Sequence, residues 1–189
     1  MPKLSKYAGL QACLSVAVLL VCSFSSAEAT LMKYLEVEDL ARRATEVIHG
    51  EVMSTKTYWD DAHQHILTGV RVQVSDCYKG KSMRGAVVSL VQLGGTLDGL
   101  TMDYSGRPTF RVGESLVVFA RPNQHNELLV VGLKQGKLAV RGNEAVRELS
   151  GISFVDADLT PTGNRATGRK TVQMRYTLNE LRDRVARVR

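Results

Sequence analysis

Cysteine is scarce in this 189-residue chain, which has only three. Cys13 and Cys22 precede residue 30, and only Cys77 follows it. A single thiol cannot form an intramolecular disulfide, so we expect the region after residue 30 to depend on its hydrophobic core alone. Cys77 follows a Val-rich segment near the end of a strand, and no arrangement of basic, acidic and histidine residues in the sequence marks it as reactive. This context favours a buried structural cysteine over a reactive or intermolecular thiol.

The chain also lacks the short motifs that carry common chemistry. It contains no Gly-x-x-x-x-Gly-Lys phosphate loop, no dinucleotide fingerprint and no Gly-x-Ser-x-Gly nucleophile turn. Aromatic residues are only 6% of the chain, which disfavours single-stranded nucleic acid as a partner, because such binding stacks bases on aromatic rings. The carboxylates nearest glycine-rich segments are interpreted as turn residues; they are Asp76, Asp98 and Asp103. Enzymatic activity is therefore unsupported by the sequence, although it is not excluded.

The first 29 residues predict a secretory signal peptide. Lys3 and Lys6 form a short basic region, and residues 12–24 are uncharged and mostly apolar. Ala27 and Ala29 supply the small-x-small pattern that signal peptidase reads, with cleavage expected after Ala29. An uncleaved anchor is the alternative, but the apolar run is short for a span of about 20 residues. We therefore expect a secreted or periplasmic protein that has no membrane span after cleavage.

Short apolar segments with glycine-rich breaks make up the middle of the chain. Residues 116–120 are a continuous apolar run after a tight turn at Gly113, which suits a central strand covered on both faces. Residues 70–74 alternate valine with polar residues, as a half-buried strand does. Gly50 indicates a bulge or bend in an early strand. The expected strands are 47–57, 65–75, 85–93, 116–120, 128–133 and 138–140; residues 96–108 are a long loop or twisted hairpin, and 145–155 a further strand or hairpin.

Helical patterns stand at both ends of this region. Residues 35–44 carry one apolar stripe, with acidic residues in the first turn and arginines near the end. Thr177 and Glu180 form a capping box that begins an amphipathic helix. The sequence thus predicts a mainly β fold, a small OB-like and partly closed β-barrel with a short N-terminal helix and a C-terminal amphipathic helix. The expected divisions are a signal peptide (1–29), an N-terminal helix segment (30–45), the barrel (46–158), and a connector with the C-terminal helix (159–189).

The turns and strands follow one order along the chain: Asp76, Lys79 and Gly80, then residues 87–91, then Phe110, Gly113 and Glu114, then residues 117–119. This order resembles exported netrin-like domains, which are OB-type barrels related to the tissue inhibitors of metalloproteinases, and a group of exported bacterial proteins with the same layout. The resemblance covers about residues 47–140 and implies a non-catalytic exported module. Those inhibitors chelate a protease zinc through an N-terminal Cys, whereas Thr30 is the mature N-terminus predicted here, so inhibition is not implied.

His63 and His65 are the only pair with the spacing of metal ligands. Residues two apart on a strand share a face, so both imidazoles, with Asp61 or Asp60 from the adjacent turn, are candidate zinc ligands. A stable zinc site usually needs three or four protein ligands, and a solvated hairpin tip is the competing interpretation. A metal-dependent hydrolase that uses His63 and His65 is the alternative function, and no other cofactor is indicated.

Two surfaces are candidates for contact with a partner. Tyr58 and Trp59, beside the histidine pair, form either an exposed aromatic contact or a cover over the barrel end. The last helix carries an arginine cluster suited to anionic lipid or polymer, with a solvated helix face as the alternative; it comprises Arg182, Arg184, Arg187 and Arg189. We interpret the sequence as an exported, non-catalytic binding module of the cell envelope or extracellular space, which contacts a protein or envelope partner.

Overall fold

The computed structural model describes residues 31–150, 152–155 and 173–188. The predicted signal peptide, with Ala27 and Ala29, lies outside the described residues, as do residues 156–172 at the predicted barrel–connector boundary. No helix within the described ranges is long and apolar enough to cross a membrane. The elements are β1 (Leu31–Lys33), α2 (Val37–Arg43), β2 (Glu46–Trp59), β3 (Ile66–Lys79), β4 (Val87–Leu93), β5 (Gly95–Leu97), β6 (Leu100–Met102), β7 (Ser115–Pro122), β8 (Leu128–Val130), the 3-10 helix η1 (Leu133–Gly136), β9 (Lys137–Arg141), β10 (Glu144–Glu148), β11 (Ser153–Val155), β12 (Gln173–Thr177) and α3 (Leu178–Ala186).

The centre of the fold is β7. It pairs antiparallel with β2 and β9, and its end pairs with β8. All residues from 116 to 120 are 0% exposed. Val117 and Phe119 belong to a core that also contains residues of α2 and α3, whereas the other three residues of this run belong to a second core. The prediction of a strand covered on both faces is therefore confirmed.

The main sheet has eight strands in the order β12-β10-β9-β7-β2-β3-β4-β8, and β8 also pairs with β7. The strands β7, β2, β3, β4 and β8 therefore pair in a circuit. In that circuit, β8 joins β7 over three residue pairs but joins β4 through the single pair Leu90–Leu128. The second core lies within the curled sheet and contains Ile48, Val52, Val70, Val72, Val74, Leu90, Leu116, Val118 and Ala120. The structure is mainly β with two helices, as the sequence predicts.

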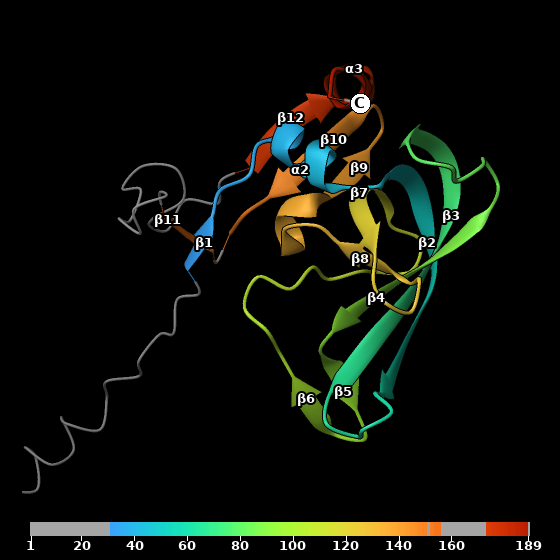
Figure 1. The fold of residues 1–189 in the computed structure, drawn as a ribbon, viewed down its shortest axis with the longest axis vertical. Helices are drawn as coiled ribbons and strands as arrows, with labels where there is room; N and C mark the ends of the chain where they lie inside the picture. The colour runs from blue at the N-terminus through green and yellow to red at the C-terminus, as the bar shows by residue number, and fades with distance from the viewer. Residues whose placement is uncertain (1–30, 151, 156–172, 189) are drawn as a thin grey trace, which may run out of the picture.

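The two helices lie together at one end of the molecule, beside β12 and β10 (Figure 1). Leu40 of α2 and Leu181 of α3 are fully buried in the core that they share with β7. At the start of α3, the Thr177 hydroxyl accepts a hydrogen bond from the amide of Glu180 at 3.1 Å. Both predicted helices are therefore confirmed, and the cap of α3 is the one that the sequence indicates.

The longest strands, β2 and β3, run down the molecule to a small β5–β6 hairpin near its other end (Figure 1). Their pairing shifts register between His49 and Gly50. A Cβ atom added at Gly50 would lie 2.3 Å from the carbonyl oxygen of Gln73, so only glycine permits this close approach. The predicted bulge at Gly50 is confirmed, and residues 96–108 contain the hairpin rather than a plain loop.

Two segments differ from the predicted strands. The strand expected over 128–133 ends at Val130, because Gly132 and Leu133 adopt left-handed conformations (φ 70° and 56°) that begin η1. The segment 145–155 is not one strand or hairpin, since β10 pairs with β9 and β12 while β11 pairs in parallel with β1. The partner of β11 lies more than 100 residues earlier in the chain, so no local pattern predicts this pairing.

Candidate functional site

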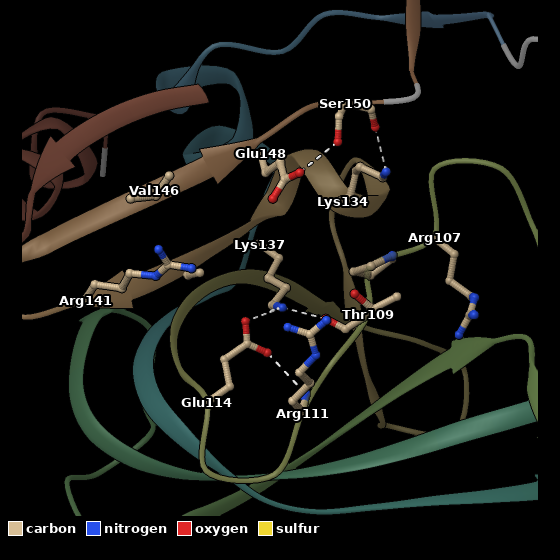
Figure 2. A pocket seen from close by; sticks show the side chains of 12 residues that line it. Arg107, Thr109, Arg111, Glu114, Lys134, Lys137, Arg141, Val146, Glu148 and Ser150 are labelled. Atoms are coloured by element: carbon tan, nitrogen blue, oxygen red, sulfur yellow. Dashed lines mark hydrogen bonds and ion pairs between the residues drawn. The ribbon is translucent and has the colours of Figure 1, made fainter. Parts of the chain in front are cut away.

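A pocket of about 330 Å³ opens between the loop 107–114, η1 and the strands β9 and β10 (Figure 2). The strand alternation explains which side chains reach it. Leu138 and Val140 of β9 pack in the core that contains residues of α2 and α3, which we call the helix-side core. Lys137, Ala139 and Arg141 therefore face the opposite way and line the pocket. We call this site the cationic pocket, because its charged lining consists of Arg107, Arg111, Lys134, Lys137 and Arg141 with the carboxylates Glu114 and Glu148. Five cations against two anions leave a formal excess of three positive charges.

Lys137 and Glu114 form an ion pair in the pocket. Lys137 Nζ donates to Glu114 Oε1 at 2.6 Å and to the carbonyl oxygen of Thr109 at 2.5 Å. Burial lowers the pKa of the Lys137 ammonium, and the hydrogen bond that Lys137 donates to Glu114 opposes that change. The other oxygen of Glu114 accepts from the amide of Arg111 at 3.2 Å. Glu114 therefore holds the loop to β9.

Two guanidinium groups of the pocket are uncommitted. Arg111 and Arg141 are exposed, and neither guanidinium makes a hydrogen bond or ion pair with another residue that the structure describes. Figure 2 shows them on either side of Lys137. Lys134 donates to the carbonyl oxygen of Ser150 at 2.9 Å, which leaves its charge without a carboxylate partner in the described region. These three charges are available to an anion from solvent.

The other two charged residues of the pocket have partners of different kinds. Arg107 pairs with the Asp103 carboxylate at 3.0 Å, so its charge is largely compensated. Glu148 accepts a hydrogen bond from the Ser150 hydroxyl at 2.8 Å and makes no ion pair with a described residue. Glu148 is exposed and therefore keeps acceptor capacity beyond the Ser150 bond at the rim of the pocket.

A buried arginine holds in place two of the elements that line the pocket. Arg147 of β10 is 0% exposed and donates to the carbonyl oxygens of Gln135 (2.9 Å) and Leu35 (2.6 Å). Gln135 in turn accepts from the amide of Leu35 at 2.9 Å. These bonds fix η1, which carries Lys134, against β10. Arg147 was not predicted as a site residue, although its place between Ala145 and Leu149 on one face of a strand was an available signal.

The predicted metal ligands lie at the turn between β2 and β3 but do not converge. His65 Nδ1 lies 2.9 Å from Asp60 Oδ2, whereas His63 stacks on the Trp59 ring with centroids 6.3 Å apart. Asp61 is exposed beside them. In the described ranges, no group of three or more His, Cys, Asp or Glu residues is placed to hold a metal ion. Of the predicted zinc ligands, the structure thus brings only Asp60 and His65 together.

Asp60 is the residue that builds this turn. Its Oδ1 accepts from the amides of Gln64 (2.7 Å) and His65 (3.1 Å), and these bonds, with the His65 ring, lower the pKa of the Asp60 carboxyl. The predicted turn at 60–61 is confirmed. Tyr58 and Trp59 are both half-buried, and Trp59 covers His63. Their role in binding a partner stays a prediction.

The arginines of α3 are partly engaged within the molecule. Arg184 binds Glu38 of α2 through two hydrogen bonds of 2.7 and 2.8 Å, and Arg182 pairs with Asp76 of β3. Arg187 is exposed, and Arg189 lies outside the described residues. The predicted contact with an anionic surface therefore loses two of its four charges to internal ion pairs.

One serine and histidine come together that the sequence did not associate. His49 Nε2 lies 3.3 Å from Ser115 Oγ, and burial lowers the pKa of His49. Asp76 lies near enough for its charge to act on His49, but it accepts hydrogen bonds from the Cys77 amide and from Arg182, and no carboxylate among the described residues is hydrogen-bonded to the His49 ring. Cys77 itself is half-buried and donates to the carbonyl oxygen of Lys79 at 3.2 Å, and burial raises the pKa of its thiol, which disfavours the reactive thiolate.

Fold and site together define a mainly β protein with a cationic pocket on the sheet face opposite its helices. In comparison with known proteins, no family model matches the chain, and no curated protein sequence matches it significantly.

Proposed function

We propose that this protein is an exported, non-catalytic binding module of the cell envelope or extracellular space, and that its partner presents an anionic group to the cationic pocket. The observation that carries the proposal is that the guanidinium groups of Arg111 and Arg141 make no hydrogen bond or ion pair with any described residue. An arginine without an internal carboxylate is matched to planar or tetrahedral anions and forms strong charge-assisted hydrogen bonds with them.

The architecture supports a binding role in a second way. The pocket lies where a loop, η1 and two strand faces meet, and ion pairs and backbone hydrogen bonds hold these walls in place. A pre-organised site loses less side-chain entropy on binding than a flexible one. The excess of two positive charges that remains after Asp103 compensates Arg107 also attracts anionic partners over distance.

We further propose that the curled part of the sheet is an OB-like barrel, as in the netrin-like domains that residues 47–140 resemble. The pairing circuit of β7, β2, β3, β4 and β8 supports this proposal. The single residue pair between β4 and β8 agrees with a barrel that is only partly closed. Export, which this proposal includes, depends on the sequence pattern of residues 1–29.

Retention on isolated cell-envelope fractions tests the function. The purified protein should sediment with the envelope, and the Arg111→Gln, Arg141→Gln double variant should lose that retention by about tenfold or more, because each hydrogen bond to a charged group contributes about 1.5–3 kcal/mol. The matched control is Arg71→Gln with Arg121→Gln, which removes the same charge from exposed arginines on β3 and β7. Unchanged retention of the pocket variant, or an equal loss in the control, would contradict the proposal.

A further inference from the structure

We infer that the ligand of the cationic pocket is a phosphate ester bearing a small hydroxylated group, held by Arg111, Arg141 and Lys137. This inference deepens the proposed function and rests on it, because it names the ligand chemistry of the same site. It is carried by the charge of the pocket, the directions from which its donors come, and the acceptor at its rim.

The charge balance favours phosphate over a carboxylate. Asp103 compensates the charge of Arg107, so four cations of the pocket face its two carboxylates and leave an excess of two positive charges. A single added carboxylate would neutralise one of these charges, whereas a phosphate monoester carries about −1.5 to −2 at neutral pH. Phosphate therefore compensates more of the excess in the same volume.

The donors approach from several directions. Arg111 comes from the loop before β7 and Arg141 from the end of β9, and Figure 2 shows Lys137 between them. A lysine ammonium has three donors, and Glu114 and Thr109 use two of those on Lys137. One N–H therefore remains for a ligand. A tetrahedral phosphate accepts bonds on several sides at once, whereas a carboxylate offers two oxygens in one plane.

The rest of the lining indicates what the phosphate is attached to. A volume of about 330 Å³ exceeds that of a phosphate alone but is at the small end of the range of ligand pockets, about 300–1,000 Å³. Ala139, Val146 and Pro108 supply apolar surface for a short carbon chain. Glu148, which makes no ion pair with a described residue, is an acceptor for hydroxyl groups of that chain. Glycerol phosphate combines these features: free, it is a monoester with the full charge, whereas within a polymer or a lipid headgroup it is a diester with one negative charge that keeps the tetrahedral phosphorus and the hydroxyl groups.

Titration of the purified protein with inorganic phosphate and with glycerol 3-phosphate, followed by amide NMR shifts, tests the inference. We expect saturable shifts in the loop 107–114 and in β9, with glycerol 3-phosphate binding more tightly than phosphate. Arg141→Gln should weaken binding about tenfold or more, while Arg71→Gln, an exposed arginine on β3, should leave it unchanged. Glu148→Gln should strengthen phosphate binding and reduce the preference for glycerol 3-phosphate.

Vesicles of phosphatidylcholine with and without phosphatidylglycerol distinguish the sources of the ester. Retention on the anionic vesicles that glycerol 3-phosphate displaces would indicate a lipid headgroup, and binding of glycerol 3-phosphate alone would indicate the free monoester. Absence of saturable shifts with either phosphate compound at millimolar concentration would overturn the inference. So would tighter binding of a hexaglutamate peptide, or equal losses in the Arg141 and Arg71 variants. Thermal melts that match the wild type establish that each variant is folded.

The inference and the proposed function fail in different ways. Envelope retention that requires Arg111 and Arg141, without any phosphate binding, would leave the proposed function standing and remove the phosphate ligand. Phosphate binding that requires Arg141, without envelope retention, would keep the ligand and remove the envelope partner.

Discussion

Arg147 is a charged side chain buried among backbone oxygens. It is 0% exposed, and its guanidinium donates to the carbonyls of Leu35 and Gln135 and lies 5.2 Å from the centre of the Tyr34 ring. Burial of a charge is costly unless hydrogen bonds replace the lost water. The bonds of Arg147 also satisfy carbonyls from distant parts of the chain, so this one residue joins the start of the domain to η1 and β10.

Replacement of Arg147 by Met should destabilise the protein by about 2–4 kcal/mol, because buried carbonyl oxygens lose their donors while the apolar volume is largely kept. Arg147→Lys should restore only part of this loss, since one ammonium cannot reach all of the acceptors that the planar guanidinium reaches. Urea denaturation monitored by circular dichroism measures both changes.

The control for Arg147 is Arg121→Met on the exposed end of β7, which should change stability by less than about 0.5 kcal/mol. Hydrogen exchange gives a local readout, because the Leu35 amide donates to Gln135 at 2.9 Å and should lose protection when Arg147 is replaced. Equal urea midpoints for wild type and Arg147→Met would refute this account.

At the level of the element, β7 is shared by the two main cores. Its alternate residues point into the helix-side core and into the curled sheet, so neither face meets water over 116–120. Such a strand couples the two cores mechanically, because protein interiors are close-packed and a shift of the strand disturbs both. The turn that carries Arg111 and Glu114 directly precedes β7 in the chain, so the position of β7 fixes one wall of the cationic pocket.

Val117→Ala and Val118→Ala should each destabilise the protein by about 2 kcal/mol, since each removes buried methyl groups and leaves a cavity, one in each core. Val112→Ala, in the preceding loop where the side chain is 65% exposed, is the matched control and should be nearly neutral. Thermal or urea denaturation compares the three. A loss at only one of the two buried positions would mean that the strand is covered on one face alone.

At the level of the whole molecule, one ion pair links helices from opposite ends of the described chain. Glu38 of α2 and Arg184 of α3 meet through two hydrogen bonds, and their side chains are only 29% and 23% exposed. The hydrogen bonds from Arg184 hold the pKa of Glu38 below its ordinary value of 4.5. A bidentate pair of this kind is stronger than a typical surface pair, which contributes about 0–1 kcal/mol.

The lowered pKa of Glu38 has a defined sign in the pH dependence of stability. The unfolded state binds the proton more readily, so the contribution of Glu38 is fully present well above pH 4.5 and is lost as the pH falls through the lowered pKa of the folded state. Glu38→Gln should therefore cost about 1 kcal/mol at pH 7 and progressively less below pH 4.

The measurement is urea denaturation from pH 7 to pH 3, and the difference between variant and wild type isolates Glu38 from the other carboxylates. Glu51→Gln, an exposed position on β2, is the control and should give a small difference at every pH. A difference at Glu38 that does not shrink on acidification would show that the ion pair does not stabilise the fold.

Much of the fold could be predicted because its determinants are local. The alternation of valines over 70–74, the apolar run 116–120 and the cap at Thr177 each act over a few residues, so six strands from β2 to β9 and both helices could be predicted. The strands β1 and β12 were not predicted. Gly50 indicated its bulge for the same reason. The early end of β8 was missed, because the left-handed conformation of Leu133 is unusual for an apolar residue and depends on its surroundings.

Most of the candidate site could not be predicted from the sequence. The spacing of His63 and His65 predicted a metal site, but spacing alone does not bring ligands together. In the structure the His63 ring stacks on Trp59 instead. The arginines of α3 were visible as a cluster, but their partners Glu38 and Asp76 lie more than 100 residues away in the chain.

The amino-acid sequence by itself determined where the strands, turns and helices form, because backbone propensity and hydrophobic periodicity act between near neighbours. Only the tertiary structure decided which of the many basic residues meet. Arg111, Lys134 and Arg141 are ordinary surface residues in the sequence, and they share a pocket because β7, η1 and β9 pack side by side. Charge acts through space, so a binding site made of charges exists only once the chain has folded.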